Sequence, residues 1–191
     1  FHSGVSCKLI DGHRGMFKAE QLKEVIHDPE QYYLPLSSLV VVENTTNKGG
    51  GACWDFEELE KIEKVCRQNK LSYNLDGARL FNALVAKNEK PRHNGKLFDS
   101  ISICLSKVLG APIGSLLLSS KENIHKAIRI RKLFGGGMRQ VGYLAAAGIY
   151  ALEHHVDRLQ EDHQRARAIG KALESSDWID VVEAIETNIV I

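Results

Sequence analysis

Short apolar segments alternate with longer amphipathic segments along most of this 191-residue chain. The strand candidates are Val5–Ile10, Leu39–Val42, Leu71–Leu75, Phe98–Leu105, Ile113–Leu118, Val181–Ile185 and Asn188–Ile191. The helix candidates are Phe17–His27, Phe56–Asn69, Leu80–Ala86, Lys121–Leu133, Met138–Glu153 and Val156–Leu173, and the polar segment Lys87–Lys96 is predicted to be a loop. Because strands that alternate with helices join into parallel sheets, this order predicts a three-layer α/β/α fold around a mostly parallel sheet.

Local signals mark the starts of two predicted helices. Asp55 is a candidate N-cap for the helix Phe56–Asn69, and Glu58 stands where a capping box places its acidic member. Ser120 is the N-cap candidate for the basic helix Lys121–Leu133. We therefore expect both helices to begin where these polar residues stand.

The charge balance and the cysteines argue against several classes of function. Lys plus Arg total 25 and Asp plus Glu total 24, a net charge of +1 that predicts neither a nucleic-acid nor a membrane-surface partner. No apolar run approaches the ~18–20 residues that a membrane span needs. The four cysteines lack CxxC spacing, and no Cys/His cluster suggests a metal site. Reduced thiols in a cytoplasmic protein are the favoured interpretation.

Polar groups follow three of the predicted strands directly. Glu43-Asn44 ends the first, Asp76 ends the second, and Ser106-Lys107 follows the third. In a parallel sheet these carboxyl ends meet at one edge, and ligands bind there. The sequence thus predicts a ligand site that contains both Asp76 and Lys107.

Lys107 is unusual because it follows a buried strand without a helix face to expose it. A lysine whose pKa is lowered by burial is a nucleophile that can form a Schiff base, although a lysine that ends a strand and reaches water has the same position. Asp76 and Lys107 could form a simple salt bridge. They also match a pyridoxal phosphate (PLP) site, in which a carboxylate hydrogen-bonds the ring nitrogen.

Four segments in this order closely resemble the low-specificity threonine aldolases, PLP enzymes with the aspartate-aminotransferase fold. They are Glu43–Thr45, Leu75–Ala83, Cys104–Pro112 and Gly135–Gln140. The segments around Asp76 and Lys107 are long enough to be highly specific, and the resemblance covers essentially the whole chain.

The resemblance implies a role for each matching residue. Lys107 would form the Schiff base, and Asp76 would pair with the pyridine nitrogen. Arg79 would help to hold the substrate carboxylate, because the fork of donors on a guanidinium matches the two oxygens of a carboxylate. Lys132 and Arg139 would approach the cofactor phosphate of a neighbouring subunit. The alternatives are a structural ion pair for Arg79 and a solvated basic helix end for Lys132 and Arg139.

The chain also departs from the family. Thr46 stands where many members have a histidine that contacts the substrate hydroxyl, so Thr46 is the candidate substrate contact at this position and the base is not assigned. The family's first third, with its phosphate loop, is missing, so we expect this piece alone to bind PLP poorly. Residues 1–155 would belong to the PLP-binding large domain, and residues 156–191 to a connecting helix and the start of a smaller α+β domain.

The implied activity is cleavage of L-threonine or L-allo-threonine to glycine and an aldehyde. The resemblance further implies a homo-oligomer, a dimer or a tetramer. A different PLP-dependent lyase that eliminates a β-substituent is the alternative within the fold. A non-catalytic fragment is the alternative outside it.

Overall fold

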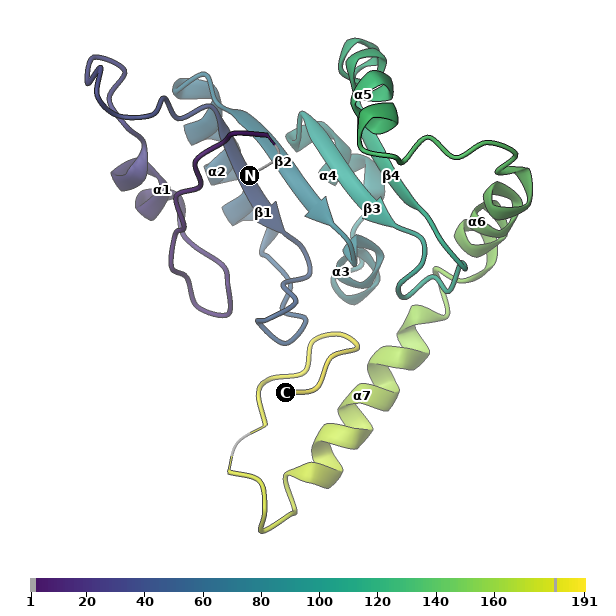
Figure 1. Ribbon diagram of the computed structural model, residues 1–191. Coiled ribbons are helices and arrows are strands. Elements are labelled where there is room, and N and C mark those ends of the chain that lie inside the picture. The colour runs from purple at the N-terminus through teal and green to yellow at the C-terminus, as the bar shows by residue number, and fades with distance from the viewer. Residues whose placement is uncertain (1–2, 181) are drawn as a thin grey trace.

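A four-stranded mixed sheet forms the centre of the computed structural model, which describes residues 3–180 and 182–191 (Figure 1). The strands are β1 (Leu39–Glu43), β2 (Ser72–Gly77), β3 (Ser100–Cys104) and β4 (Ser115–Ser119), in the spatial order β1-β2-β3-β4. β1, β2 and β3 are parallel, whereas β4 runs antiparallel to β3. The predicted α/β class with a mostly parallel sheet is confirmed.

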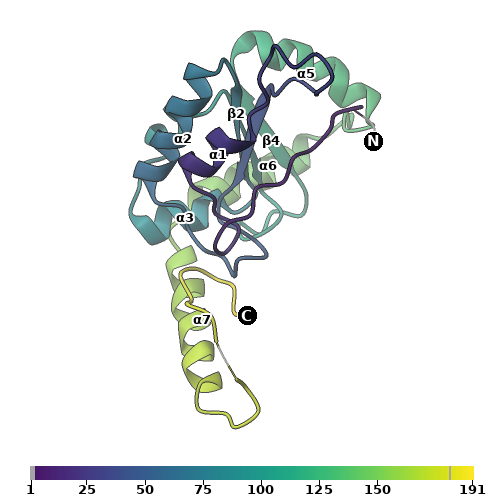
Figure 2. The same cartoon turned by 90° about the vertical axis from the view of Figure 1, so that its left-hand side faces the viewer.

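Helices connect the strands and cover the sheet. They are α1 (Ala19–Val25), α2 (Phe56–Gln68), α3 (Leu80–Lys87), α4 (Pro91–Leu97), α5 (Lys121–Leu133), α6 (Gly142–His154) and α7 (Leu159–Leu173). In Figure 2, α1 and α2 lie on one side of the sheet, and the N-terminal segment and α5 lie on the other. α7 extends away from the sheet. No helix in the described part of the chain is long and apolar enough to cross a membrane.

Alternation along the strands decides which sheet face is packed. One face presents a buried row that packs against the apolar stripe of α2: Val40, Val42, Tyr73, Leu75, Ile101, Ile103 from the strands and Leu59, Ile62, Val65, Cys66 from the helix. The opposite positions are more accessible: Leu39 and Val41 are exposed, and Asp76 and Ser102 are half-buried. The polar residues of the strands therefore lie on the more open face.

Several predicted elements differ from the structure. Val5–Ile10 forms no strand, and Leu9 is exposed, because no neighbouring strand pairs with this segment. The predicted loop Lys87–Lys96 contains most of α4, which begins at Pro91, a residue suited to the first turn of a helix. α6 begins at Gly142 rather than Met138. α7 begins at Leu159 rather than Val156.

The two C-terminal strand predictions are also wrong. Val181 lies outside the described residues, and residues 182–185 and 188–191 have no strand pairing. Val182 and Ile185 pack against Gly170 of α7 instead. These apolar residues are explained by their contact with α7. An apolar segment can bury its side chains in this way as a strand or as an irregular loop, so the apolar pattern alone does not indicate a strand.

The cap predictions had mixed outcomes. Ser120 caps α5 as expected, because its hydroxyl accepts a hydrogen bond of 3.2 Å from the Asn123 N–H. Asp55 lies at the N-cap of α2, but its side chain makes no cap bond. The capping box with Glu58 is wrong: the Glu58 carboxylate accepts from the Ala19 N–H at 2.9 Å and so ties α1 to α2.

A buried polar pair joins α3 to α7. His163 of α7 is 1% exposed, and its Nε2 lies 3.0 Å from Nδ2 of Asn82 in α3. Burial, reinforced by the positive charge of Arg167, holds the pKa of His163 below its ordinary value. The folded protein therefore favours the neutral ring.

We expect the free energy of unfolding to fall as the pH drops below the ordinary histidine value of about 6.5. The unfolded chain takes up the His163 proton first, so this contribution is complete above that pH and is lost below it. Urea unfolding at pH 7.5 and 5.5 should show a smaller pH effect in His163→Gln than in the unsubstituted protein. Substitution of the exposed His154 is the control, and an equal pH effect in His163→Gln would contradict the assignment.

Candidate functional site

The ends of the parallel strands bring the predicted polar residues into one row. The strand register pairs Glu43 with Asp76 and Asp76 with Ser102. Just beyond β1, the Asn44 N–H donates a 3.0 Å hydrogen bond to the Asp76 carbonyl oxygen. Lys107 follows β3 after a short turn. Asp76 and Lys107 therefore come from the ends of adjacent parallel strands, as the sequence predicts.

The Asp76 carboxylate is half-buried and only partly satisfied. Its Oδ1 accepts a hydrogen bond from the Ala78 N–H at 3.1 Å, and no other described residue contacts this side chain through a hydrogen bond or an ion pair. A groove of about 560 Å³ extends along β1 and reaches Asp76 and Glu43. The carboxylate can thus receive a donor from a ligand in this space.

Lys107 is exposed on the loop between β3 and β4. Among the described residues it forms no ion pair with Asp76, so the salt-bridge alternative does not describe this arrangement. The Gly110 N–H donates to the Lys107 carbonyl at 3.1 Å, and the Ala111 N–H donates to the Leu105 carbonyl at 3.0 Å. These bonds define the backbone of the loop, and the Lys107 amine makes no hydrogen bond or ion pair with the described residues.

A second apolar cluster anchors the loop that carries Lys107, residues 105–111, which we call the lysine loop. Leu105, Leu109 and Ala111 are buried together with Ala151 of α6 and Leu159 of α7. Because buried residues stand both before and after Lys107 in the sequence, both halves of the loop are held against α6 and α7.

One side chain adds a polar contact to the same loop. His155, at the C-terminal end of α6, lies with its Nδ1 2.6 Å from the Leu109 carbonyl oxygen. A carbonyl oxygen only accepts, so Nδ1 carries the proton and donates it. The backbone two residues after Lys107 is therefore bound to α6.

Arg79 and Thr46 occupy the neighbouring strand ends. Arg79 is half-buried at the N-cap of α3, and its side chain makes no hydrogen bond or ion pair within residues 3–180 and 182–191. This result does not support the structural ion pair as its role. Thr46 is buried, and its hydroxyl donates to the Ala52 carbonyl at 3.4 Å. Of the two predicted substrate contacts, Arg79 has the available side chain.

Lys132 and Arg139 are not brought to these strand ends. Both are exposed, Lys132 near the end of α5 and Arg139 in the loop that follows. α5 lies at the opposite end of the sheet from the carboxyl ends of β1, β2 and β3 (Figure 1). Any role of Lys132 at the cofactor of this same chain would need a different arrangement.

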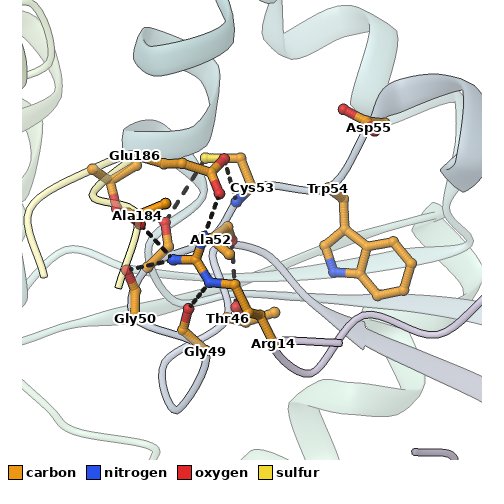
Figure 3. Close-up of polar contacts among 12 residues, drawn as sticks. Arg14, Thr46, Gly49, Gly50, Ala52, Cys53, Trp54, Asp55, Ala184 and Glu186 are labelled. Carbon is orange, nitrogen blue, oxygen red and sulfur yellow. Dashed lines mark hydrogen bonds and ion pairs between the residues drawn. The ribbon is translucent and has the colours of Figure 1, made fainter. Parts of the chain in front are cut away.

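The sequence reasoning missed the contacts that hold the glycine loop, residues 47–53. Figure 3 shows Arg14 inserted between this loop and the C-terminal segment, with Glu186 beside it. Glu186 Oε2 also accepts from the Cys53 N–H at 3.2 Å. Burial, and then the Glu186 carboxylate, raise the pKa of the Cys53 thiol to about 12, so it is not a nucleophile. Gly49, Gly50 and Gly51 are typical of a loop with unusual backbone angles, but no local pattern indicates its distant partners.

No group of three or more His, Cys, Asp and Glu side chains in the described ranges could hold a metal ion. The donor set near the strand ends is instead two carboxylates, Glu43 and Asp76, with one amine, Lys107, and one guanidinium, Arg79. A carboxylate with an open oxygen and a nearby free amine suit a protonated ring nitrogen and an aldehyde, the two features of PLP. The residues present therefore fit this cofactor.

We expect His155→Leu to lower the free energy of unfolding by about 1–3 kcal/mol, because the Leu109 carbonyl loses its donor. Urea unfolding followed by circular dichroism measures the change. The matched control is His154→Leu at the exposed neighbouring position, where we expect less than about 0.5 kcal/mol. Equal effects at both positions would show that the Leu109 bond does not stabilise the lysine loop.

Comparison with known proteins places this chain among proteins about twice its length. It is 39% identical to "Low-specificity L-threonine aldolase 1" of Arabidopsis thaliana, an alignment that covers 98% of this chain and 53% of the relative. Among solved structures, a putative L-allo-threonine aldolase from Listeria monocytogenes matches 96% of this chain and 49% of its own, with a TM-score of 0.81 and 23% identity. The chain thus spans about half the length of the curated relatives it matches.

More distant structures share the fold alone. A PLP-bound C-S lyase from Staphylococcus hominis matches 86% of this chain and 41% of its own, with a TM-score of 0.60 and 16% identity. The family model for the beta-eliminating lyases matches residues 1–191. The chain belongs to the beta-eliminating lyase family.

Proposed function

We propose that the full-length protein to which this chain belongs is a PLP-dependent aldolase. It cleaves L-threonine and L-allo-threonine to glycine and an aldehyde, which is acetaldehyde for these substrates. The observation that carries the proposal is the pair at the strand ends: Asp76 with an open carboxylate oxygen, and Lys107 with a free amine on an anchored loop. The named relatives support the same reaction.

Each residue has a task that its position permits. Asp76 accepts a hydrogen bond from the ring nitrogen and keeps that nitrogen protonated. Lys107 would hold the cofactor through its amine, which reacts with an aldehyde. Arg79 holds the substrate carboxylate with its unpaired guanidinium. When PLP is bound, its protonated ring withdraws the electron pair that is released as the Cα–Cβ bond breaks.

The remaining assignments concern the assembled protein. We propose a homo-oligomer in which Lys132 and Arg139 reach the phosphate of a neighbouring subunit's cofactor, and the position of α5 at the opposite end of the sheet from the carboxyl ends of β1, β2 and β3 supports this for Lys132. Thr46 lines the substrate side through its backbone, because its hydroxyl is bound to Ala52. We further propose a cytoplasmic location, and residues 1–155 and 156–191 as parts of two domains.

A β-eliminating lyase is the second candidate, because the matching family has that name. The two reactions give different products from the same site. Glycine with an aldehyde indicates the aldolase, whereas a keto acid with ammonia indicates elimination. Product analysis of the full-length protein with PLP and L-threonine decides between them.

We expect Lys107→Ala to reduce aldehyde release from L-threonine to the level without enzyme, because the variant lacks the amine that we propose attaches the cofactor. Borohydride reduction of the unsubstituted holoprotein, followed by peptide mapping, should find the pyridoxyl group on Lys107. Lys121→Ala, which removes an exposed amine at the start of α5, should leave both results unchanged. A pyridoxyl group on a different lysine would refute the assignment.

We expect Asp76→Asn to lower kcat/KM for L-threonine by about 10²–10³-fold. The amide keeps the shape and the bond from Ala78 but no longer keeps the ring nitrogen protonated. Initial rates over a range of substrate concentrations measure the effect. Asp157→Asn, at an exposed position outside the site, should stay close to the unsubstituted rate.

A further inference from the structure

A tight turn presents Arg14 to the glycine loop. The Gly15 N–H donates to the Gly12 carbonyl and the Met16 N–H donates to the His13 carbonyl, both at 3.0 Å. Arg14 itself has a φ of 52°, in the left-handed region that residues with a side chain seldom adopt. Tertiary contacts must favour this conformation, and they come from the arginine side chain.

The Arg14 guanidinium joins three separate pieces of the chain (Figure 3). Its Nε donates to the Gly49 carbonyl at 2.8 Å, and its Nη2 donates to Gly50 at 3.3 Å and to Ala184 at 2.8 Å. Its Nη1 donates to Glu186 Oε1 at 2.9 Å. The Arg14 side chain is only 10% exposed, so this ion pair is screened less than one at the surface.

The same turn packs closely on the glycine loop and on Thr46. A Cβ atom at Gly49 would collide with the Arg14 backbone and with the Thr46 hydroxyl, and one at Gly15 would touch the Thr46 side chain. Only glycine permits this approach of the two backbones. Thr46 is consequently enclosed between the Arg14 turn and the loop that Arg14 holds.

A short series of backbone hydrogen bonds connects the glycine loop that Arg14 holds to Asp76. The Gly51 N–H donates to the Thr46 carbonyl at 2.9 Å, and the Thr46 N–H donates to the Ala52 carbonyl at 3.0 Å. Two residues earlier, Asn44 donates to the Asp76 carbonyl. A shift of the glycine loop would therefore move the backbone that lies beside Asp76.

We infer that Arg14 is a positioning residue that sets the preference of the site between L-threonine and L-allo-threonine. The two substrates have the same charge and size and differ only in configuration at Cβ. Lys107, Asp76 and Arg79 act on groups that both substrates share, so they do not distinguish between them. In this proposal the segment from Asn44 to Ala52, which Arg14 holds and which follows β1 beside Asp76, faces the Cβ substituents, so its displacement changes their fit. This inference rests on the proposed aldolase function.

The experiment compares full-length, PLP-loaded variants by the ratio of kcat/KM for the two amino acids. In Arg14→Gln we expect the ratio to change by roughly three- to tenfold, because the loop is no longer held in one position. Arg14→Lys, which keeps the charge but not the fork of donors, should give an intermediate ratio. Glu186→Gln, which keeps the shape of the partner, should give a smaller change in the same direction.

Arg67→Gln is the matched control. Arg67 also makes a 2.9 Å ion pair and a hydrogen bond to a carbonyl, but it does so with Asp99 and Leu97, beside the first residue of β3 rather than its carboxyl end. Its removal should lower stability without altering the substrate ratio. Hydrogen exchange adds a measurement that needs no activity. Compared with the unsubstituted protein, the amides of residues 47–53 should exchange faster in Arg14→Gln, whereas their exchange rates should not change in Arg67→Gln.

The outcomes separate the two claims. If the unsubstituted holoprotein cleaves neither amino acid, the proposed function is wrong, and with it the inference about substrate preference. If it cleaves both and Arg14→Gln retains the ratio, even with lower activity, Arg14 is structural only and the inference is overturned. Should Arg14→Gln fail to fold, the ratio in Glu186→Gln decides in the same way.

Discussion

The parallel register of β1, β2 and β3 is the constraint on which the rest of the structure depends. It places Glu43, Asp76 and Ser102 in one row, and the loop of Lys107 follows β3, the strand paired with the strand that carries Asp76. The register is held because one face of these strands, with Tyr73 and Leu75, is buried against α2. A slip by one residue would turn the Asp76 side chain toward that apolar core. The packing of one sheet face thus determines which polar side chains lie on the other face.

The loops beyond the strands are held by contacts that lie far away in sequence. Leu109 and His155 anchor the loop that bears Lys107, and Arg14 with Glu186 anchors the glycine loop. Each loop combines bonds to its own backbone with polar side chains from distant elements: His155 for the lysine loop, and Arg14, Glu186 and Thr187 for the glycine loop. The side chain of Lys107 can then be exposed while the backbone that carries it stays fixed, which is the arrangement that a binding site on loops needs.

Local sequence signals succeeded where the determining interaction is itself local. Ser120 caps α5 because the bond to Asn123 spans three residues. The β1, β2 and β3 segments were recognised because apolar runs of that length pack into sheets. Glu58 was misassigned for the opposite reason: its carboxylate prefers the Ala19 N–H, 39 residues away, to its own helix start. The apolar C-terminal segment likewise packs on α7, a partner that its periodicity does not identify.

The sequence by itself determined the fold class, the order of the elements from α1 to α7 apart from α4, and the pair Asp76 and Lys107 at neighbouring strand ends, because strand alternation and the carboxyl-end rule are properties of local pattern. Only the tertiary structure decided which side chains are free to react and which are structural. It left Asp76, Lys107 and Arg79 with open donors or acceptors, and it buried the Thr46 hydroxyl against Ala52. It also joined Arg14 to Glu186 across 172 residues. No local pattern contains such a contact, since it exists only when the sheet has brought the two segments together.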